Sequence, residues 1–282
     1  MDSYLALMKK IYTEGVDKEG RNGFTRSLFT HQLRFDLSQG FPAMTTKVLM
    51  FNAVVAELLF FISGERDNTL LTNLKCNIWT ANAEAEYWKP KAEFEGDLGR
   101  VYGVQWRHWR DASGKETDQL KNLVTTLKTD PNNRRMIVTA WNPGELDVMA
   151  LPPCHMLFQV YVADGKLSLH MFQRSCDYFL GVPFNIATYA LLAHLLARIA
   201  DLEVGEVILT LGDVHIYHAH FDAVEEQLKR KPYPLPTLYV DPSITSLEDL
   251  DIHNFKTPED VRAAIRLENY QHHPVIKAPF IV

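Results

Sequence analysis

The chain is organised around the segment Met149-Ala150-Leu151-Pro152-Pro153-Cys154-His155 and two segments that follow it, Gln173-Arg174-Ser175-Cys176-Asp177 and Gly181-Val182-Pro183-Phe184-Asn185. The first segment sets a thiol in a turn braced by prolines. The second places an arginine beside a hydroxyl and a carboxylate, and the third ends in an amide that opens an apolar helix. These groups are suited to activating a base by nucleophilic addition and to holding a phosphate.

Each of these residues also has a purely structural interpretation. A lone cysteine such as Cys154 is more often a small buried hydrophobic residue than a nucleophile. Arg174 could form a surface ion pair. Asn185 could cap the helix that follows it, with Phe184 packing as a hydrophobic staple. The functional interpretation therefore depends on the three segments occurring together.

The composition predicts one large globular domain, residues 1–282. Of its 282 residues, 46% are hydrophobic and 23% are charged, which is ordinary for a chain with a sizeable core. No Pro-, Ser- or Gly-rich linker divides the chain. The net charge of -6 gives no overall basic surface for general nucleic-acid binding, although a local basic cluster could bind an anion.

The cysteines and the hydropathy pattern predict a soluble cytoplasmic protein. Cys76, Cys154 and Cys176 are odd in number and lack C-x-x-C spacing, which argues against a disulfide framework or a structural zinc site. The N-terminus has no basic lead into a long apolar run. No apolar stretch approaches the roughly 18 residues of a membrane span, so we expect no membrane association.

The first half of the chain predicts two helices with a loop and a strand between them. Apolar residues at helical spacing indicate a helix near the N-terminus, and residues 20–27 form a Gly- and hydroxyl-bearing loop. A strand is expected at 33–37. Residues 51–62 form a helix that is apolar almost all round, so its Glu57 should be buried or line a cleft. An unpaired buried carboxylate has a raised pKa, whereas pairing with an arginine or with backbone N–H groups is the structural alternative.

The second half adds more strands, which makes the chain α+β with a mixed β-sheet packed by helices. Strands are expected at 136–141, at 156–161 and 166–172 around a turn at Asp164-Gly165, and at 207–211. Arg134 and Arg135 precede the first of these. Adjacent residues of a strand point to opposite faces, so only one of this pair could easily serve its own chain's pocket.

The motifs resemble those of the thymidylate synthase family, from about Arg21 to Val282. Besides the three opening segments, the resemblance includes Glu57-Leu58-Leu59 and the segment from Gly96 to Arg107. It implies a thymidylate synthase-like domain whose sheets stack across a homodimer interface. It also implies reductive methylation of dUMP to dTMP, with 5,10-methylenetetrahydrofolate as carbon donor and reductant and without a metal.

The resemblance also implies a role for individual residues. Cys154 would be the nucleophile that adds to C6 of uracil, with its thiolate stabilised by Arg174, and Glu57 would relay protons. Tyr102 and Asp177 complete the implied catalytic set. The residues implied to bind dUMP are Arg21, Gln173, Arg174, Ser175, Asn185, His215 and Tyr217, with Arg134 and Arg135 from the partner chain. Those implied to bind folate are Trp79, Asp177, Leu180, Gly181, Phe184 and Ala278.

The chain departs from the family's pattern in two places. The loop at Arg21 is shorter, and Gly20 stands where an aspartate is usual. Around the expected folate entrance, Val48, Met50 and Asn52 stand where bacterial relatives often carry basic or imidazole groups, and Thr80 replaces an aspartate. These changes put folate affinity and closure of the C-terminal end over the ligands in question.

Two other functions stay open on the sequence. In a dUMP hydroxymethylase, the same nucleotide activation would be followed by capture of the methylene group by water instead of hydride. A non-catalytic RNA-binding protein on the same fold is the third alternative. The acidic net charge and the intact Cys154 argue against RNA binding as the sole role, although it could be a secondary activity.

Overall fold

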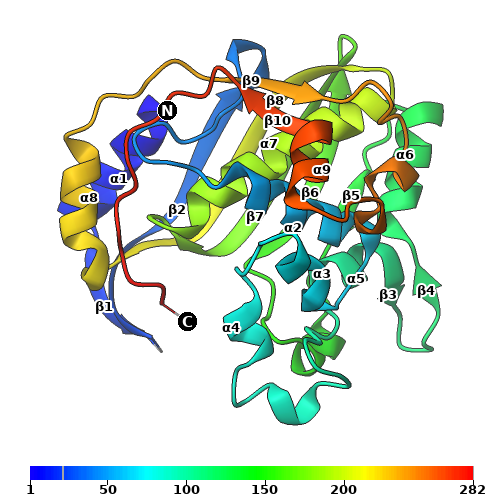
Figure 1. Ribbon diagram of the computed structural model, residues 1–282, viewed down its shortest axis with the longest axis horizontal. Coiled ribbons are helices and arrows are strands. Elements are labelled where there is room, and N and C mark those ends of the chain that lie inside the picture. Colours follow the sequence, from blue (N-terminus) through cyan, green and yellow to red (C-terminus); the bar gives the residue numbers. More distant parts are fainter. Residues whose placement is uncertain (21, 282) are drawn as a thin grey trace.

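A six-stranded mixed sheet with the order β1-β2-β8-β7-β6-β5 forms the centre of the computed structural model (Figure 1), which describes residues 1–20 and 22–281. Strands β7 and β8 are parallel because helix α7 crosses over between them, and the other neighbours in the sheet are antiparallel. The strands of this sheet are β1 (Val16–Gly20), β2 (Gly23–Asp36), β5 (Ile137–Thr139), β6 (His155–Ala163), β7 (Lys166–Asp177) and β8 (Glu203–Tyr217).

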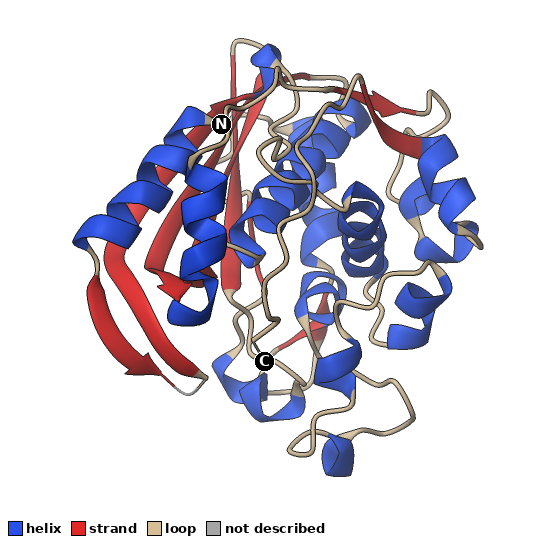
Figure 2. Cartoon of the chain, turned by 60° about the vertical axis from the view of Figure 1, so that its left-hand side comes forward, coloured by secondary structure: helices blue, strands red, loops and turns tan. Residues whose placement is uncertain are grey.

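The helices are concentrated on one side of this sheet (Figures 1 and 2). Two small antiparallel pairs lie outside it, β3 (Trp109–Arg110) with β4 (Glu116–Thr117), and β9 (Thr237–Val240) with β10 (Ile265–Glu268). The arrangement confirms the predicted α+β class with a mixed sheet packed by helices. The helices are α1 (Asp2–Glu14), α2 (Phe51–Ser63), α3 (Asn68–Asn73), α4 (Thr80–Ala83), α5 (Tyr102–His108), α6 (Gln119–Thr129), α7 (Gly181–Ile199), α8 (Phe221–Leu228) and α9 (Pro258–Ala264).

Helices α2 and α7 form the centre of the hydrophobic core. Helix α7 packs on β7 and β8, and α2 packs on α7. The expectation that no apolar stretch has the length of a membrane span is wrong for α7, whose 19 residues are long and apolar enough to cross a bilayer. Of its most apolar window, 78% is buried inside the protein. The sheet and α2 therefore account for the apolar character of this helix.

The opposite face of the sheet carries no helix from this chain in the described structure. Along β7 and β8, side chains alternate between buried ones that face the helices and partly exposed ones that face away. His170 and Thr210 lie on the uncovered face, where they share a hydrogen bond of 2.8 Å. Phe29 of β2 is 85% exposed.

Several local expectations need correction. Residues 20–27 are not a loop, because β1 and β2 pair from Val16 and Ser27 up to Gly20 and Gly23 at the hairpin tip. Gly23 has a φ of 110°, which favours glycine. The strand expected at 33–37 is the end of the longer β2, and the strand expected at 136–141 is reduced to β5.

Two expectations around the central motif also fail. Helix α7 begins at Gly181, so Asn185 lies inside its first turns and is not its cap. Arg134 and Arg135 lie in a turn before β5, so the alternation of side chains along a strand does not apply to them. By contrast, the hairpin at Asp164-Gly165 is confirmed, since both residues have the positive φ of a tight β-turn.

Candidate active site

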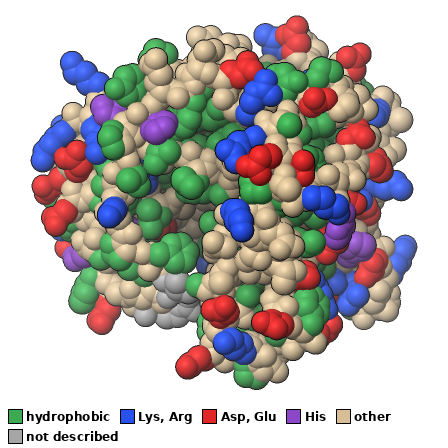
Figure 3. Space-filling view, in the orientation of Figure 1, with side chains coloured by type: hydrophobic (Ala, Val, Ile, Leu, Met, Phe, Trp, Pro, Cys, Tyr) green, Lys and Arg blue, Asp and Glu red, His purple; other side chains and the backbone are tan. Residues whose placement is uncertain are grey.

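A cavity of about 790 Å³ lies where the carboxyl ends of β7 and β8 meet the β1–β2 hairpin, α4 and the C-terminal segment. The space-filling view shows a hollow near the middle of this face of the molecule (Figure 3). The cavity is lined by Lys18, Glu19, Gly20, Asn22, Gly23, Thr25, Asn82, Leu151, Pro152, Cys154, Arg174, Ser175, Asp177, Asp213, His215, Tyr217, Phe280 and Ile281.

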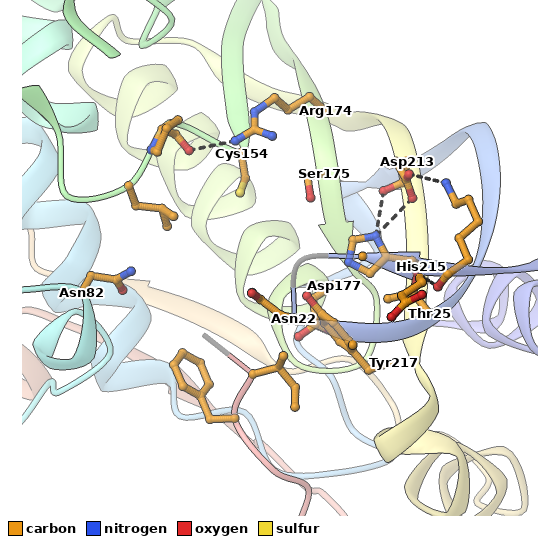
Figure 4. Close-up of a pocket in the computed structure, with 18 residues that line it drawn as sticks. Asn22, Thr25, Asn82, Cys154, Arg174, Ser175, Asp177, Asp213, His215 and Tyr217 are labelled. Atoms are coloured by element: carbon orange, nitrogen blue, oxygen red, sulfur yellow. Dashed lines mark hydrogen bonds and ion pairs between the residues drawn. The ribbon is translucent and has the colours of Figure 1, made fainter. Parts of the chain in front are cut away.

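Cys154 occupies one wall, in the loop that leads into β6 (Figure 4). Its backbone N–H donates a hydrogen bond of 2.7 Å to the hydroxyl of Tyr102. Burial raises the pKa of the Cys154 thiol, while the Arg174 guanidinium and the Tyr102 hydroxyl act in the opposite direction. The net direction differs from the expected thiolate, because burial outweighs the arginine.

Arg174 holds the loop that carries the thiol. Its Nε donates to the carbonyl of Pro153 at 2.9 Å, and Nη2 donates to that of Pro152 at 3.0 Å. Its backbone N–H donates to the carbonyl of Cys154 at 2.8 Å. The alternative of a surface ion pair is therefore wrong. The guanidinium braces the loop and keeps a positive charge beside the thiol.

Behind the cysteine wall lies a buried network that begins at Glu57. The indole Nε1–H of Trp79 donates to Oε1 of Glu57 at 2.8 Å. Burial raises the pKa of Glu57 to about 7, and the indole bond partly offsets this rise. The ring of Tyr102 lies 5.8 Å from that of Trp79 and stacks on His155 at 4.1 Å. Glu57 is thus paired with an indole, and among residues 1–20 and 22–281 neither an arginine nor a backbone N–H group bonds to it.

The opposite wall is polar. Asp213 contacts Nδ1 of His215 at 3.2 Å, and its other oxygen accepts a bond of 2.7 Å from Lys18. The bond from His215 and, after it, the bond from Lys18 hold the pKa of Asp213 at about 2. Figure 4 shows this wall, with Tyr217 and Thr25, across the cavity from Asn82. Two aligned hydrogen-bonding residues, His215 and Tyr217, therefore face the same space.

Gln173 and Asp177 fix their surroundings through backbone and amide contacts. Gln173 is 2% exposed, and its Nε2 donates to Oδ1 of Asn185 and to the carbonyl of Ser175, both at 3.0 Å. Oδ1 of Asp177 accepts from the N–H groups of Phe179 at 3.1 Å and Leu180 at 3.2 Å. The start of α7 is thereby held against the end of β7.

A family model described as thymidylate synthase matches residues 2–282 of this chain. The chain belongs to the thymidylate synthase family. Membership indicates a one-carbon transferase of thymidylate biosynthesis, in a family that uses methylenetetrahydrofolate and is generally a homodimer that binds nucleotide and folate. Among residues 1–20 and 22–281, no three His, Cys, Asp or Glu side chains are grouped so that they could hold a metal ion.

The residues expected from the thymidylate synthase motifs fall into three groups in this structure. Those that line the cavity together are Cys154, Arg174, Ser175, Asp177, His215 and Tyr217. Those outside its lining are Glu57, Trp79, Tyr102, Gln173, Leu180, Gly181, Phe184, Asn185 and Ala278, together with the exposed pair Arg134 and Arg135. Arg21 lies outside the described residues, although its neighbours Gly20 and Asn22 line the cavity.

Several residues of the site were not identified from the sequence. Asp213 could have been found, because it lies two residues before His215 and so shares its face of β8. Lys47 is buried, donates to the carbonyl of Phe179 at 2.6 Å, and has its pKa lowered to about 8 by burial. No local sequence pattern indicates Asn82 or His220. Only the tertiary fold brings Asn82 to the cavity and His220 to the C-terminal segment.

Proposed function

We propose that this protein is a thymidylate synthase that converts dUMP to dTMP with 5,10-methylenetetrahydrofolate and releases dihydrofolate. The observation that carries the proposal is one cavity that joins the Cys154 thiol to Arg174, Ser175, His215 and Tyr217, in a chain matched by the family over residues 2–282. Its volume of about 790 Å³ is in the upper part of the range for small-molecule sites, which suits a nucleotide and a second ring system.

Cys154 supplies the covalent step of the proposed reaction. C5 of uracil is a weak nucleophile, and addition of the thiolate to C6 makes C5 enolate-like. Because burial raises the pKa of the thiol, the thiolate is a minority form near neutral pH. Arg174, fixed beside the loop by three hydrogen bonds, is the cation that stabilises it. C5 would then bond to the methylene carbon of the folate and lose its proton, and delivery of hydride to that carbon with expulsion of the sulfur from C6 would return the free thiol.

The polar wall is proposed to bind the sugar and the phosphate of dUMP. Ser175 and Arg174 offer donors to the phosphate, and Arg21 would add a guanidinium at the tip of the hairpin. His215, oriented by Asp213, and Tyr217 are placed to bind a sugar hydroxyl. Arg174 lies beside Cys154, whereas His215 and Tyr217 lie on the polar wall, so the bound nucleotide would extend between these two walls.

We propose that Asn185 reads the uracil base. Its amide offers a donor to O4 and an acceptor to N3–H, a pattern that matches uracil and not cytosine. Gln173 donates to Oδ1 of Asn185 and so fixes which side of the amide is the acceptor. Asn185 lies just outside the cavity lining, one turn into α7. The proposal requires the base to reach past Asp177 to that turn.

Glu57 is proposed to relay protons to and from the base. A carboxyl with a pKa of about 7 exchanges its proton near neutral pH, which suits general acid–base catalysis. Trp79 and Tyr102 connect it to the cysteine loop. Water would complete the path, because Glu57 itself does not line the cavity.

Bound methylenetetrahydrofolate supplies the one-carbon unit and the hydride. We propose that Asp177 orients its ring system, and that Trp79, Leu180, Gly181, Phe184 and Ala278 surround it. Leu151, Phe280 and Ile281 give this part of the cavity an apolar wall that suits a flat heterocycle and excludes water. None of Val48, Met50, Asn52 and Thr80 lines the cavity, so their expected effect on folate affinity stays a prediction.

We further propose a homodimer in which the partner subunit's Arg134 and the partner subunit's Arg135 contact the phosphate. Two observations support it. The pair is exposed and lies away from the cavity of its own chain. The face of the sheet that bears His170 and Thr210 carries no helix of its own chain among the described residues. Stacking of two such faces would bury both sheets. The cytoplasmic location stays a prediction.

Hydroxymethylation of dUMP is the second candidate function. Asn82 favours it, because this buried amide lines the cavity and could hold a water molecule near the methylene group. The apolar residues Phe280 and Ile281 also line the cavity and favour methylation, since they offer no polar group that could hold a water molecule there.

Product analysis separates the two functions. The purified protein is incubated with dUMP and methylenetetrahydrofolate, the nucleotide is identified by mass, and dihydrofolate is followed by absorbance. Thymidylate with an equal amount of dihydrofolate supports the proposal. Hydroxymethyl-dUMP with tetrahydrofolate would replace it with hydroxymethylation. If neither product forms at full dUMP saturation, both proposed functions are refuted.

A further inference from the structure

His220 is a fully buried polar side chain that the proposed reaction does not use. It lies in the short helix His218–His220 that follows β8, and its exposed fraction is 0%. Its Nε2 lies 2.8 Å from the carbonyl oxygen of Pro279, 59 residues further along the chain. A carbonyl oxygen only accepts hydrogen bonds, so Nε2 carries the proton and donates it to Pro279.

The other ring nitrogen of His220 faces the cavity residue Asp177. Nδ1 lies 3.9 Å from Oδ1 of Asp177 and makes no hydrogen bond within the described part of the chain. The rings of Phe179 and Tyr217 flank the imidazole, with centroids at 5.4 and 5.5 Å. The imidazole is thus fixed between the end of β7, the end of β8 and the C-terminal segment.

Few hydrogen bonds join the C-terminal segment to the rest of the chain. Arg230 donates to the carbonyl of Pro274 at 2.7 Å, and the backbone N–H of His273 donates to that of Thr45 at 2.8 Å. Within the described residues 275–281, Ile276 and Ala278 pack against the core, and the hydrogen bond from His220 is the one hydrogen bond that joins this stretch to the rest of the chain. Directly after it come Phe280 and Ile281, which line the cavity with Cys154.

We propose that His220 is a positioning residue that holds the C-terminal wall of the cavity against the loop of Asp177. The bond to Pro279 places Phe280 and Ile281, and the ring packs on Phe179, whose N–H group bonds to Asp177. His220 therefore couples the two walls assigned above to methylenetetrahydrofolate. Among the residues assigned to dUMP, Tyr217 packs its ring against the imidazole, a contact that a phenyl ring preserves, and no hydrogen bond joins His220 to Arg174 or Ser175 in the described structure. The kinetic part of the test rests on the proposed function.

Three variants separate the hydrogen bond from the shape of the ring. His220→Phe keeps a ring without polar atoms, His220→Gln keeps a donor at a similar reach, and His220→Asn has an amide too short for Pro279. Loss of one buried hydrogen bond predicts a rise of about 3- to 10-fold in KM for methylenetetrahydrofolate in the Phe and Asn variants. We expect the affinity for dUMP to stay within about 2-fold and the Gln variant to restore most of the loss.

A chain ending at Ala278 serves as the matched background. Without residues 279–282, His220 has nothing to position, so His220→Phe should cause no further rise in KM for methylenetetrahydrofolate. An additional rise of the same size in the shortened chain would overturn the proposal, because His220 would then act independently of the segment. An effect of the Phe variant on dUMP affinity equal to its effect on KM for the folate would also overturn it.

A second readout does not require turnover. Cys76 and Cys176 are 1% and 0% exposed, so iodoacetamide should modify Cys154 first, and peptide mass analysis reports its rate. Displacement of Phe280 and Ile281 should speed modification in His220→Phe and His220→Asn, and leave it unchanged in His220→Gln. Equal rates in all four full-length proteins would refute the positioning role.

If no product forms from dUMP and the folate, the proposed function fails, but the rate of Cys154 modification still tests His220. If His220→Phe does not fold, the modification rate of His220→Asn is compared with that of wild type instead.

Discussion

The buried carboxyl of Glu57 makes the stability of this protein depend on pH in a predictable direction. Burial raises its pKa from the usual 4.5 to about 7, so the folded state binds this proton more tightly than the unfolded chain does. Such a carboxyl does not lower the stability of the fold at a pH below its pKa in the unfolded chain. Its destabilising effect is complete at a pH above its pKa in the folded protein. At 1.36 kcal/mol per pH unit, the interval from 4.5 to about 7 corresponds to about 3 kcal/mol.

Glu57→Gln removes the ionisation and keeps an oxygen for the Trp79 indole. We therefore expect the stability of the variant relative to wild type, measured as its free energy of unfolding, to be about 2 kcal/mol greater at pH 8 than at pH 5. Urea denaturation at the two pH values measures it. Glu84→Gln, an exposed position close to the same site, should show no such difference and serves as the control. An equal effect of Glu57→Gln at both pH values would refute the raised pKa.

The remaining predictions concern the reaction. Cys154→Ala should lose turnover yet bind dUMP within about 3-fold of wild type in calorimetry, because only the nucleophile is removed; substantial turnover would exclude Cys154. Asn185→Asp should shift the ratio of kcat/KM from dUMP toward dCMP, since a protonated carboxyl matches the edge of cytosine; unchanged selectivity would place base recognition elsewhere. A protein with Arg134→Ala and Arg135→Ala should be inactive alone and regain activity when refolded together with Cys154→Ala; failure of this mixture would exclude arginines supplied by the partner chain.

Local sequence patterns were sufficient to predict the elements whose structure depends mainly on their own residues. The apolar pattern of α2 gave its bounds to within one residue, and Asp164-Gly165 gave the hairpin, because the turn needs residues that accept a positive φ. The start of α7 was misplaced, because Asn185 resembles a cap while the chain already turns helical at Gly181, next to the hydrogen-bonded Asp177.

Features that depend on distant contacts could not be predicted in the same way. The hairpin tip around Gly23 looked like a loop, because its strand character comes from pairing between β1 and β2, while β2 pairs with β8 only from Thr25 onward. His220 contacts Pro279 across 59 residues, and no local pattern indicates such a contact. The pKa of Cys154 was expected to fall because a neighbouring guanidinium such as Arg174 stabilises a thiolate, but the fold buries the thiol and raises its pKa.

The most direct test of the central claim is to trap the bond between Cys154 and C6 of the nucleotide. With 5-fluoro-dUMP and methylenetetrahydrofolate, the covalent adduct should persist, because fluorine at C5 cannot leave as a cation in place of the proton. Mass analysis of the denatured protein should then find the nucleotide and the folate on the peptide that contains Cys154, and no adduct in Cys154→Ala. An unmodified Cys154 under saturating ligands, or an adduct on another residue, would contradict the account.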